Sequence, residues 1–437
     1  MKGMILVMNI NNKEYMPRLI DKKISDYLQV FGAITIEGPK WCGKTWTSIK
    51  HSKTQTYMDE KEVQDMALLD PKMIFENDLN KRPQLIDEWH LVPEIWDAVR
   101  RECDKSTIRG NFILTGSTAL SKKENNLKIK HSGTGRICRI NMYTMSLYES
   151  KDSTGKASIT SMYNNTQENV NNGNIEISQL ADLIIRGGWP DNINTEKSKI
   201  GLIPKAYIKN VLEKDINHED GKQRDINKMR MLLRSLARNE TAIVNNKTLI
   251  RDIEEYESGD DLLSSRDTII DYLDILDRLH LIENQEAYSD NYRSPERIGK
   301  SAKRHFTDPS LACACLDLTS EKLTKDLNTF GFMFEALVER DLRIYMDYLD
   351  GHIYHFRDNT SGLEVDSILE FADGEYAAVE IKLGFNQVDD AIKNLVKFSN
   401  NMKKKPKFMC VIVGKTIGVV RDPKTGIYIV PITALKP

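Results

Sequence analysis

The chain has 437 residues, 40% of them hydrophobic, which is enough for about two to four domains with separate cores. Its 62 Lys and Arg residues nearly balance 64 Asp and Glu residues. This balance excludes a global field that would attract nucleic acid or an anionic membrane, so any such binding must use a local patch.

Several features of the sequence indicate a cytoplasmic protein that binds no membrane. The apolar run at residues 4–8 is too short for a signal peptide, and no run approaches about eighteen consecutive apolar residues. The six cysteines contain no C-x-x-C pair and no group with zinc spacing. We therefore expect neither disulfides nor a structural metal.

The first strong local signal is a loop between a predicted strand at 33–36 and a predicted helix at 45–50. It fits G-x-x-x-x-G-K-[ST], the pattern of a loop whose backbone N–H groups surround a phosphate. A chance glycine turn is the alternative interpretation. The residues expected to bind the nucleotide are Gly38, Pro39, Lys40, Trp41, Cys42, Gly43, Lys44, Thr45 and Trp46.

Two side chains of this loop have predicted roles beyond shaping the backbone. Lys44 is expected to reach the β- and γ-phosphate oxygens, and the Thr45 hydroxyl is expected to bind Mg²⁺. The predicted cofactors are therefore ATP and Mg²⁺.

Four further strands are predicted, and helical patterns fill most of the gaps between them. Strands that alternate with helices indicate a parallel α/β sheet covered on both faces. A polar stretch over residues 150–173 then resembles a flexible insertion or linker. The predicted strands are 56–59, 84–87, 112–115 and 139–143.

Polar residues that end these strands supply the expected hydrolytic chemistry. Asp87 is predicted to hold Mg²⁺, and Glu88 to polarise the attacking water. Thr115 is expected to orient that water or to sense the γ-phosphate. Arg136 and Arg139 are candidates for the cation that neutralises transition-state charge, in cis or from a neighbouring subunit, although either is equally well a packing arginine.

The middle of the chain is predicted to be helical, with helices at 225–238, 247–256 and 265–280. Two short strands at 281–284 and 304–306 follow, so the pattern is typical of a winged-helix module. The loop between the strands is basic and would suit DNA phosphates, although a solvated loop explains it equally well. Its cations are Arg293, Arg297, Lys300, Lys303 and Arg304.

The last part of the chain is predicted to run helix, three strands, helix, strand, starting with a helix at 330–349 that carries Glu335. Asp366 and the later Glu380 and Lys382 resemble the PD-(D/E)xK nuclease arrangement, because alternation along a strand puts Glu380 and Lys382 on one face. Glu335, Asp366 and Glu380 are the expected Mg²⁺ ligands, with Lys382 activating a water, and Glu364 adds acidity. The alternative is an inactive scaffold whose charges form an internal ion pair.

Several segments together resemble the AAA-like bacterial and archaeal ATP-binding proteins that carry a C-terminal restriction-endonuclease-like domain. The resemblance covers nearly the whole chain and implies an ASCE-type ATPase core, a helical or winged-helix middle and a nuclease-like end. The chain departs from the commoner pattern at residues 40–42, so Trp41 either packs on the loop or contacts the base. The segments are 38–40, 43–45, 85–88 with Pro93, 114–117, 135–136, 145–147 with Glu149, and 186–190.

The sequence therefore predicts a P-loop ATPase domain at 1–200, a helical winged-helix-like domain at 201–325 and a nuclease-like domain at 326–437. The expected function is Mg²⁺-dependent ATP hydrolysis coupled to a nuclease-like module, with nucleic acid as a candidate partner. A nucleotide-responsive binding switch with an inactive module is the alternative, and a small-molecule kinase lacks a visible acceptor site. The oligomeric state and the choice between ATP and GTP stay open.

Overall fold

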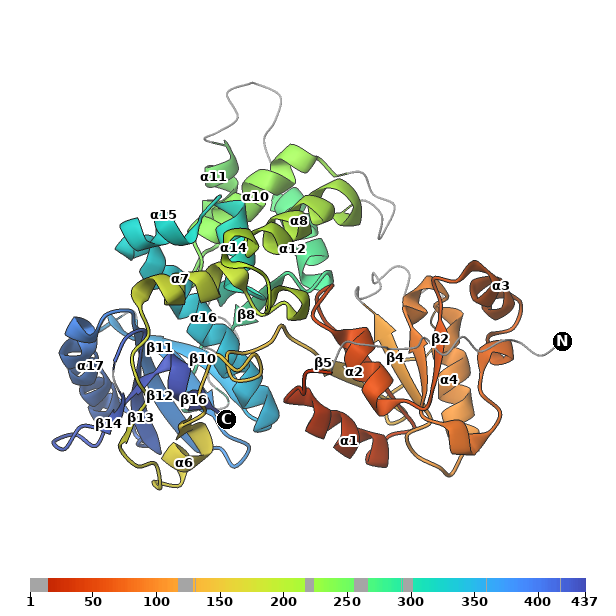
Figure 1. Cartoon of the computed structure of the whole chain (residues 1–437), viewed down its shortest axis with the longest axis horizontal. Helices are drawn as coiled ribbons and strands as arrows, with labels where there is room; N and C mark the ends of the chain where they lie inside the picture. The colour runs from red at the N-terminus through yellow and green to blue at the C-terminus, as the bar shows by residue number, and fades with distance from the viewer. Residues whose placement is uncertain are drawn as a thin grey trace. The chain divides into compact units, whose positions relative to one another are not determined.

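The structure is a computed structural model of the chain (Figure 1). It describes residues 15–116, 129, 131–216, 224–254, 266–291, 293, 302–358, 360–416 and 418–437. The chain divides into two compact units, which are described separately here. Unit 1 comprises residues 1–143 and 278–280, and unit 2 comprises residues 144–277 and 281–437. The division at 143/144 lies well before the domain boundary that the sequence suggested near residue 200.

Unit 1 contains a sheet of five parallel strands in the order β2-β3-β4-β1-β5. The order is decisive for function, because it inserts β4 between β1, which precedes the glycine-rich loop, and β3, which ends in Asp87. The predicted parallel α/β sheet is thus confirmed. Its strands are β1 Ala33–Glu37, β2 Thr54–Tyr57, β3 Gln84–Asp87, β4 Phe112–Gly116 and β5 Ile137–Asn141.

Helices cover both faces of this sheet, as the apolar strand sequences require. Alternate residues of β1 point to opposite faces, so Ile34 and Ile36 pack with Ile24 of α1, whereas Ala33 belongs to the core that contains Val99 of α4. The described helices of unit 1 are α1 Ile20–Val30, α2 Lys44–His51, α3 Lys61–Leu69 and α4 Glu94–Lys105.

The first part of unit 2 is mostly helical and contains a short antiparallel hairpin of β8 (Ile282–Gln285) and β9 (Lys303–Phe306). The three helices and the hairpin predicted from the sequence are present within one or two residues of their expected bounds. Side chains cap several of the helices; Asp225, for example, accepts hydrogen bonds from the first turn of α10. The helices are α6 Ile159–Tyr163, α7 Ile177–Arg186, α8 Leu202–Asn210, α10 Ile226–Arg238, α11 Asn246–Glu254, α12 Arg266–Arg278, α14 Pro309–Cys315 and α15 Ser320–Lys325.

The C-terminal part of unit 2 is a mixed sheet in the order β10-β11-β12-β13-β15-β14-β7. Strand β12 pairs antiparallel with β11 and parallel with β13, so both of its edges are paired over residues 377–379. The predicted order of helix, three strands, helix and strand is present. The elements are α16 Leu327–Tyr348, β10 His352–Asp358, β11 Leu363–Glu370, β12 Tyr376–Lys382, α17 Val388–Asn401, β13 Phe408–Val413, β14 Gly418–Arg421, β15 Tyr428–Pro431 and β16 Leu435–Lys436.

Two helices pack on this sheet, with α17 against β11, β12 and β13, and α16 against β10 and β12 (Figure 1). The apolar stripe of α17 includes Val388, Leu395 and Phe398, which are all buried among strand residues. The first turns of α16 and the loop that follows β12 both line a pocket, which is described below.

The segment 150–173, which the sequence suggests is a flexible insertion, is integrated into unit 2. Its strand β6 (Ala157–Ser158) pairs with β16, and its strand β7 (Val170–Asn171) pairs with β14 at the edge of the large sheet. Polar composition misled the prediction, because an edge strand needs backbone partners and few apolar side chains.

A buried junction in unit 2 explains two of the segments that carry the family resemblance. Asp308 accepts hydrogen bonds from Gly188 N at 2.9 Å and from Thr144 Oγ1 at 2.9 Å, and it pairs with Arg340 Nη1 at 3.0 Å. A Cβ atom on Gly188 would lie 2.1 Å from the carbonyl oxygen of Met145, so only glycine fits there. We infer that these segments fix the packing of unit 2 and do not form a binding surface.

Candidate functional site

The glycine-rich loop leaves β1 and enters α2 in a shape that only glycine permits at two positions. A Cβ atom on Gly38 would lie 2.1 Å from the carbonyl oxygen of Met142, and Gly43 has φ of 103°, in the left-handed region, where it caps α2. Helix α2 therefore points its N-terminal N–H groups toward the loop, as a phosphate site requires.

Lys44 lies across this loop and is almost fully buried. Its Nζ donates to the carbonyl oxygens of Gly38 at 2.8 Å and Pro39 at 2.9 Å. Both partners are neutral backbone groups, so neither hydrogen bond pairs the ammonium with a carboxylate. A bound phosphate would gain that charge in exchange for two ordinary hydrogen bonds.

Asp87 lies at the centre of a small polar cluster at the carboxyl ends of the strands. Its Oδ1 and Oδ2 atoms are each 3.2 Å from Oγ1 of Thr45, and its Oδ1 also accepts a hydrogen bond from Thr115. Burial raises the pKa of Asp87 and the neighbouring Glu88 adds to the rise, while the two threonine hydroxyls act against it. A carboxylate held in this way gains from a nearby cation.

The oxygen atoms of this cluster fit Mg²⁺, which takes one or two protein ligands and completes its shell with water and substrate phosphates. Within the described ranges, no group of three or more His, Cys, Asp or Glu residues is arranged to hold a metal. A magnesium ion at Thr45 and Asp87 would therefore depend on the nucleotide.

Glu88 follows Asp87 in a left-handed conformation with φ of 54°, which turns the chain out of β3 into the turn Trp89–Leu91. Its Oε2 atom lies 3.3 Å from Nδ1 of His90, and its side chain is about one-third exposed. This position, next to the cluster and open to solvent, suits a residue that would orient water. His90 was not expected from the sequence.

The structure does not bring Arg136 to this cluster. It precedes β5, and its carbonyl oxygen accepts from the N–H of Ala33, the first residue of β1. The loop begins after the last residue of β1, roughly 16 Å further along the strand direction. The Nε atom of Arg136 instead pairs with Oδ1 of Asp104 at 2.7 Å. The structure therefore does not support a role for Arg136 in cis at the γ-phosphate. Arg139 lies 3.4 Å from Glu37, with its guanidinium over the ring of Trp96.

The remaining loop residues differ in exposure. Cys42 is fully buried and Lys40 partly buried, whereas Trp41 is 50% and Trp46 41% exposed. Trp41 is thus half buried and half exposed, which is compatible both with packing on the loop and with contact to a base.

Sequence reasoning missed the residues that hold the loop from outside. Arg18 is buried and donates to the carbonyl oxygens of Cys42 and Tyr143, both at 2.8 Å. Tyr15 donates to Asp21 at 2.6 Å, and its hydroxyl oxygen lies 3.3 Å from the Thr47 hydroxyl of α2, which can donate to it. No motif contains these residues; the signal available was an amphipathic helix before the first strand, which we did not predict.

In unit 2, three of the predicted residues do come together on neighbouring strands. Lys382 Nζ lies 3.1 Å from Oδ2 of Asp366 and 2.6 Å from Oε2 of Glu380, and Asn394 of α17 donates to Glu380 at 2.8 Å. Burial, together with Asp366, raises the pKa of Glu380 to about 8. Burial would also raise the pKa of Asp366, but Lys382 and Lys303 outweigh it and lower that pKa.

Glu335 reaches this cluster from α16, but its direct partner is a residue that we assigned elsewhere. Lys303 of β9 donates to Oε1 of Glu335 at 3.0 Å and lies 4.0 Å from Oε1 of Glu364. Burial, with Asp366 nearby, raises the pKa of Glu335 to about 7. Because Lys303 is 2% exposed, its predicted role as a DNA-contacting cation is wrong.

The rest of the basic loop gives little support to a nucleic-acid surface. Arg304 donates to the carbonyl oxygen of Val244 at 3.2 Å and to Asn246 at 3.0 Å, so it serves packing within unit 2. Arg293 is exposed. The predicted contacts of Arg297 and Lys300 lie outside the described residues, as does the end of the 114–117 segment.

These observations define unit 1 as a P-loop nucleotide-binding domain. The model of the AAA domain matches residues 31–151. Two domains of unknown function, DUF8612 and DUF4143, match residues 177–322 and 330–435. The N-terminal part of the chain is thus an AAA-family ATP-binding domain, followed by two domains whose functions are not assigned.

Two solved structures are similar to this chain at low identity. A Walker-type ATPase of Pyrococcus abyssi has 11% identity and a TM-score of 0.40, covering 68% of this chain and 94% of that one. The ORC2 protein of Aeropyrum pernix, with ADPNP and ADP, has 12% identity and a TM-score of 0.32, covering 72% and 97%. No curated protein matches the chain. Across the described residues, no helix is long and apolar enough to span a membrane.

Proposed function

We propose that the AAA domain of this protein binds ATP with Mg²⁺ and hydrolyses it. One observation carries the proposal: Asp87, at the end of β3, is hydrogen-bonded both to Thr45 of the phosphate loop and to Thr115 of β4. In this arrangement Lys44 binds the β- and γ-phosphates, and Thr45 and Asp87 hold the metal. Thr115 lies on β4, between the strands that lead to the loop and to Asp87, where it would sense the γ-phosphate.

Hydrolysis further needs a group that orients water, and Glu88 fills that role. It follows Asp87 directly, and its carboxylate is fixed beside His90. Arg136 is bound to Asp104 at the far end of the strands, so a transition-state arginine, if one is used, is Arg139, which lies beside Glu37, or comes from a neighbouring subunit.

Phosphate release by the purified protein tests this proposal. We expect Glu88→Gln to lower turnover by about 10²- to 10⁴-fold, the usual contribution of a general base, while ATP binding is kept. Glu62→Gln, an exposed change on α3, is the matched control and should behave as the wild type. Equal release by the wild type and Glu88→Gln would remove Glu88 from this role.

For unit 2 we propose a nuclease-like module that acts on nucleic acid. The supporting observation is the convergence of Asp366, Glu380 and Lys382 from two paired strands, with Glu335 close by. Asp366 and Glu380 would hold Mg²⁺ after Lys382 moves from between them toward the scissile phosphate. The three helices and hairpin before it support a winged-helix interpretation of the middle part.

The competing function is a nucleotide-responsive switch whose C-terminal module is inert. The ion pairs of Lys382 with both carboxylates favour it, because they already neutralise the acidic cluster. Incubation of DNA or RNA with Mg²⁺ or Mn²⁺ separates the two. Cleavage that Asp366→Ala and Lys382→Ala both abolish supports a nuclease; cleavage that survives both discards the site, and the absence of cleavage selects the switch.

A further inference from the structure

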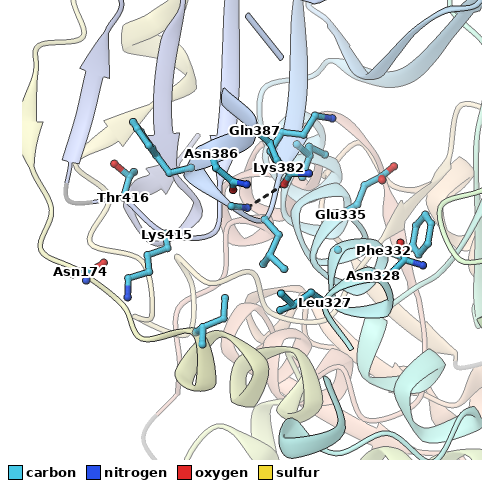
Figure 2. Close-up of a pocket in the computed structure, with 16 residues that line it drawn as sticks. Asn174, Leu327, Asn328, Phe332, Glu335, Lys382, Asn386, Gln387, Lys415 and Thr416 are labelled. Atoms are coloured by element: carbon cyan, nitrogen blue, oxygen red, sulfur yellow. Dashed lines mark hydrogen bonds between the residues drawn. The ribbon is translucent and has the colours of Figure 1, made fainter. Parts of the chain in front are cut away.

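A pocket of about 1030 Å³ opens beside the charged cluster of unit 2 (Figure 2). One wall is the start of α16, with Leu327, Asn328, Phe332 and Glu335, and the facing wall is the loop after β12. Figure 2 shows Lys382, Asn386 and Gln387 on that second wall, with Asn174, Lys415 and Thr416 on a third side. The volume is at the upper end of sites that take small molecules, about 300–1,000 Å³.

The lining of the pocket combines aromatic, amide and charged side chains. Phe332 and Phe385, on facing walls, are 44% and 56% exposed, which is high for phenylalanine. The lining also includes the side-chain amides of Asn386 and Gln387 and the charged side chains of Lys382 and Glu335. The pocket therefore offers aromatic surfaces, groups that both donate and accept hydrogen bonds, and an ammonium within one cavity.

The absence of a side chain at Gly331 leaves open space on the α16 wall of the pocket. Gly331 lines the pocket from the interior of a 22-residue helix, and a Cβ atom built on it would meet no atom within 4 Å. Glycine at this position weakens the helix, and no neighbouring atom requires a residue without a side chain there. The free space in front of it belongs to the pocket.

We propose that this pocket binds unstacked nucleobases of a single-stranded nucleic acid, next to the phosphodiester that reaches Lys382. The inference rests on the proposed action of unit 2 on nucleic acid and names its substrate class. Bases stack on exposed aromatic rings whatever their sequence, and the amides of Asn386 and Gln387 pair with base edges. Bases within a duplex cannot enter a cavity without leaving the stack, so an intact duplex would bind poorly.

An extended peptide is the other occupant that such a lining suggests, and the sheet argues against it. Peptides that bind beside a strand add to an open edge. Strand β12, which leads into the pocket wall, is paired with β13 through Lys382 and with β11 as far as Val379; beyond that point the N–H of Ile381 donates to Asp366 Oδ2 at 2.8 Å. The pocket thus provides side-chain amides but no free strand edge.

The test measures binding of fluorescein-labelled 12-nucleotide single strands, as DNA and as RNA, in EDTA, so that cleavage plays no part. We expect the wild type to bind single strands at least tenfold more tightly than a duplex of the same sequence. Gly331→Leu fills the cavity with a better helix former and should lower single-strand affinity about tenfold or more. Asn400→Leu, which places a leucine on the exposed side of α17 outside the pocket and leaves the charge unchanged, should change nothing.

A second pair of variants tests the aromatic contact. Phe385→Ala should weaken single-strand binding by roughly tenfold, as for one lost stacking partner, whereas Leu202→Ala, also an exposed apolar residue of unit 2, should not. Equal single-strand affinity of the wild type, Gly331→Leu and Phe385→Ala would overturn the inference, as would a preference for duplex. So would binding of an unrelated 12-residue peptide to the wild type with higher affinity than the single strands.

The outcomes separate this inference from the proposed nuclease. Asp366→Ala should abolish cleavage and keep single-strand binding, because Asp366 does not line the pocket. If the wild type binds single strands in EDTA but cleaves none with metal, the nuclease proposal fails and the pocket stands. If cleavage is found and Gly331→Leu leaves it and binding unchanged, the pocket fails and the nuclease stands.

Discussion

The phosphate loop of unit 1 and the charged clusters of unit 2 differ in the partners of their cationic side chains. Lys44 donates only ordinary hydrogen bonds to backbone carbonyls of its own loop, whereas Lys382 lies between two carboxylates and Arg340 between Asp308 and Asp341. The first cation is ready for an incoming anion, and the others are already neutralised. Lys382 and Arg340 therefore contribute first to the fold of unit 2, and their loss should lower its stability.

The largest effect on stability should come from Arg340. Both of its carboxylate partners are fully buried, so Arg340→Met leaves buried charge without a partner and should lower the free energy of unfolding of unit 2 by about 3–5 kcal/mol. Urea titration followed by hydrogen-exchange mass spectrometry measures the free energy of unfolding of each unit separately. Arg230→Met, on the exposed side of α10, should stay within about 0.5 kcal/mol. A loss below about 1 kcal/mol would contradict the internal role of Arg340.

A matched pair of lysine variants compares the two regions directly. Lys382→Met should destabilise unit 2 by about 3 kcal/mol, at the low end for a broken ion pair because the side chain is 26% exposed. Lys44→Met should cost unit 1 only about 1 kcal/mol, since it leaves two carbonyl oxygens without a donor, yet it should abolish ATP binding. The same urea titration and an ATP-binding titration measure both. Equal destabilisation by the two changes would show that the difference between these sites is not real.

Lowering the pH should decrease the stability of unit 2 through the protonation of Asp308. Burial would raise its pKa, but Arg340 and the hydrogen bonds from Ser310 and Gly188 outweigh burial, so the folded pKa lies below the ordinary 3.8. Its contribution is therefore complete above about pH 4 and is lost as pH falls through the folded pKa, by about 1.4 kcal/mol for each pH unit that separates the folded and unfolded pKa values. The stability of unit 2 in urea between pH 2.5 and pH 5 measures this. Asp308→Asn should flatten that pH dependence, and an unchanged slope would contradict the prediction.

The smallest expected effect has the opposite sign and concerns unit 1. Burial and the charge of Glu88 raise the pKa of Asp87, so its ionised form is held at a cost in the metal-free protein. Asp87→Asn should stabilise unit 1 by about 0.5 kcal/mol at pH 7 without metal, and it should abolish Mg²⁺-dependent hydrolysis. A gain in stability with a loss of activity is common when a functional residue is replaced. Asp59→Asn, an exposed change after β2, is the control. Destabilisation by Asp87→Asn would mean that the hydrogen bonds of Asp87 outweigh its burial.

The sequence by itself determined the phosphate loop, the parallel sheet of unit 1 and the positions of Asp87, Glu88 and Thr115. Each of these follows from local rules: glycine spacing in one loop, apolar runs in strands, and polar residues at strand ends. Strand alternation likewise put Glu380 and Lys382 on one face of β12, and the structure confirms that Asp366 joins them.

Only the tertiary structure decided which residues far apart in the chain meet. Lys303 is basic in a basic stretch, yet it packs against Glu335, because α16 brings an acid next to β9. Arg136 lies one residue before β5, and the direction of that parallel strand carries it away from the phosphate loop. Arg18 supports the loop through backbone carbonyls, which leave no mark in any motif. The physical reason is the same each time: periodicity fixes the face of an element, and packing alone fixes what that face meets.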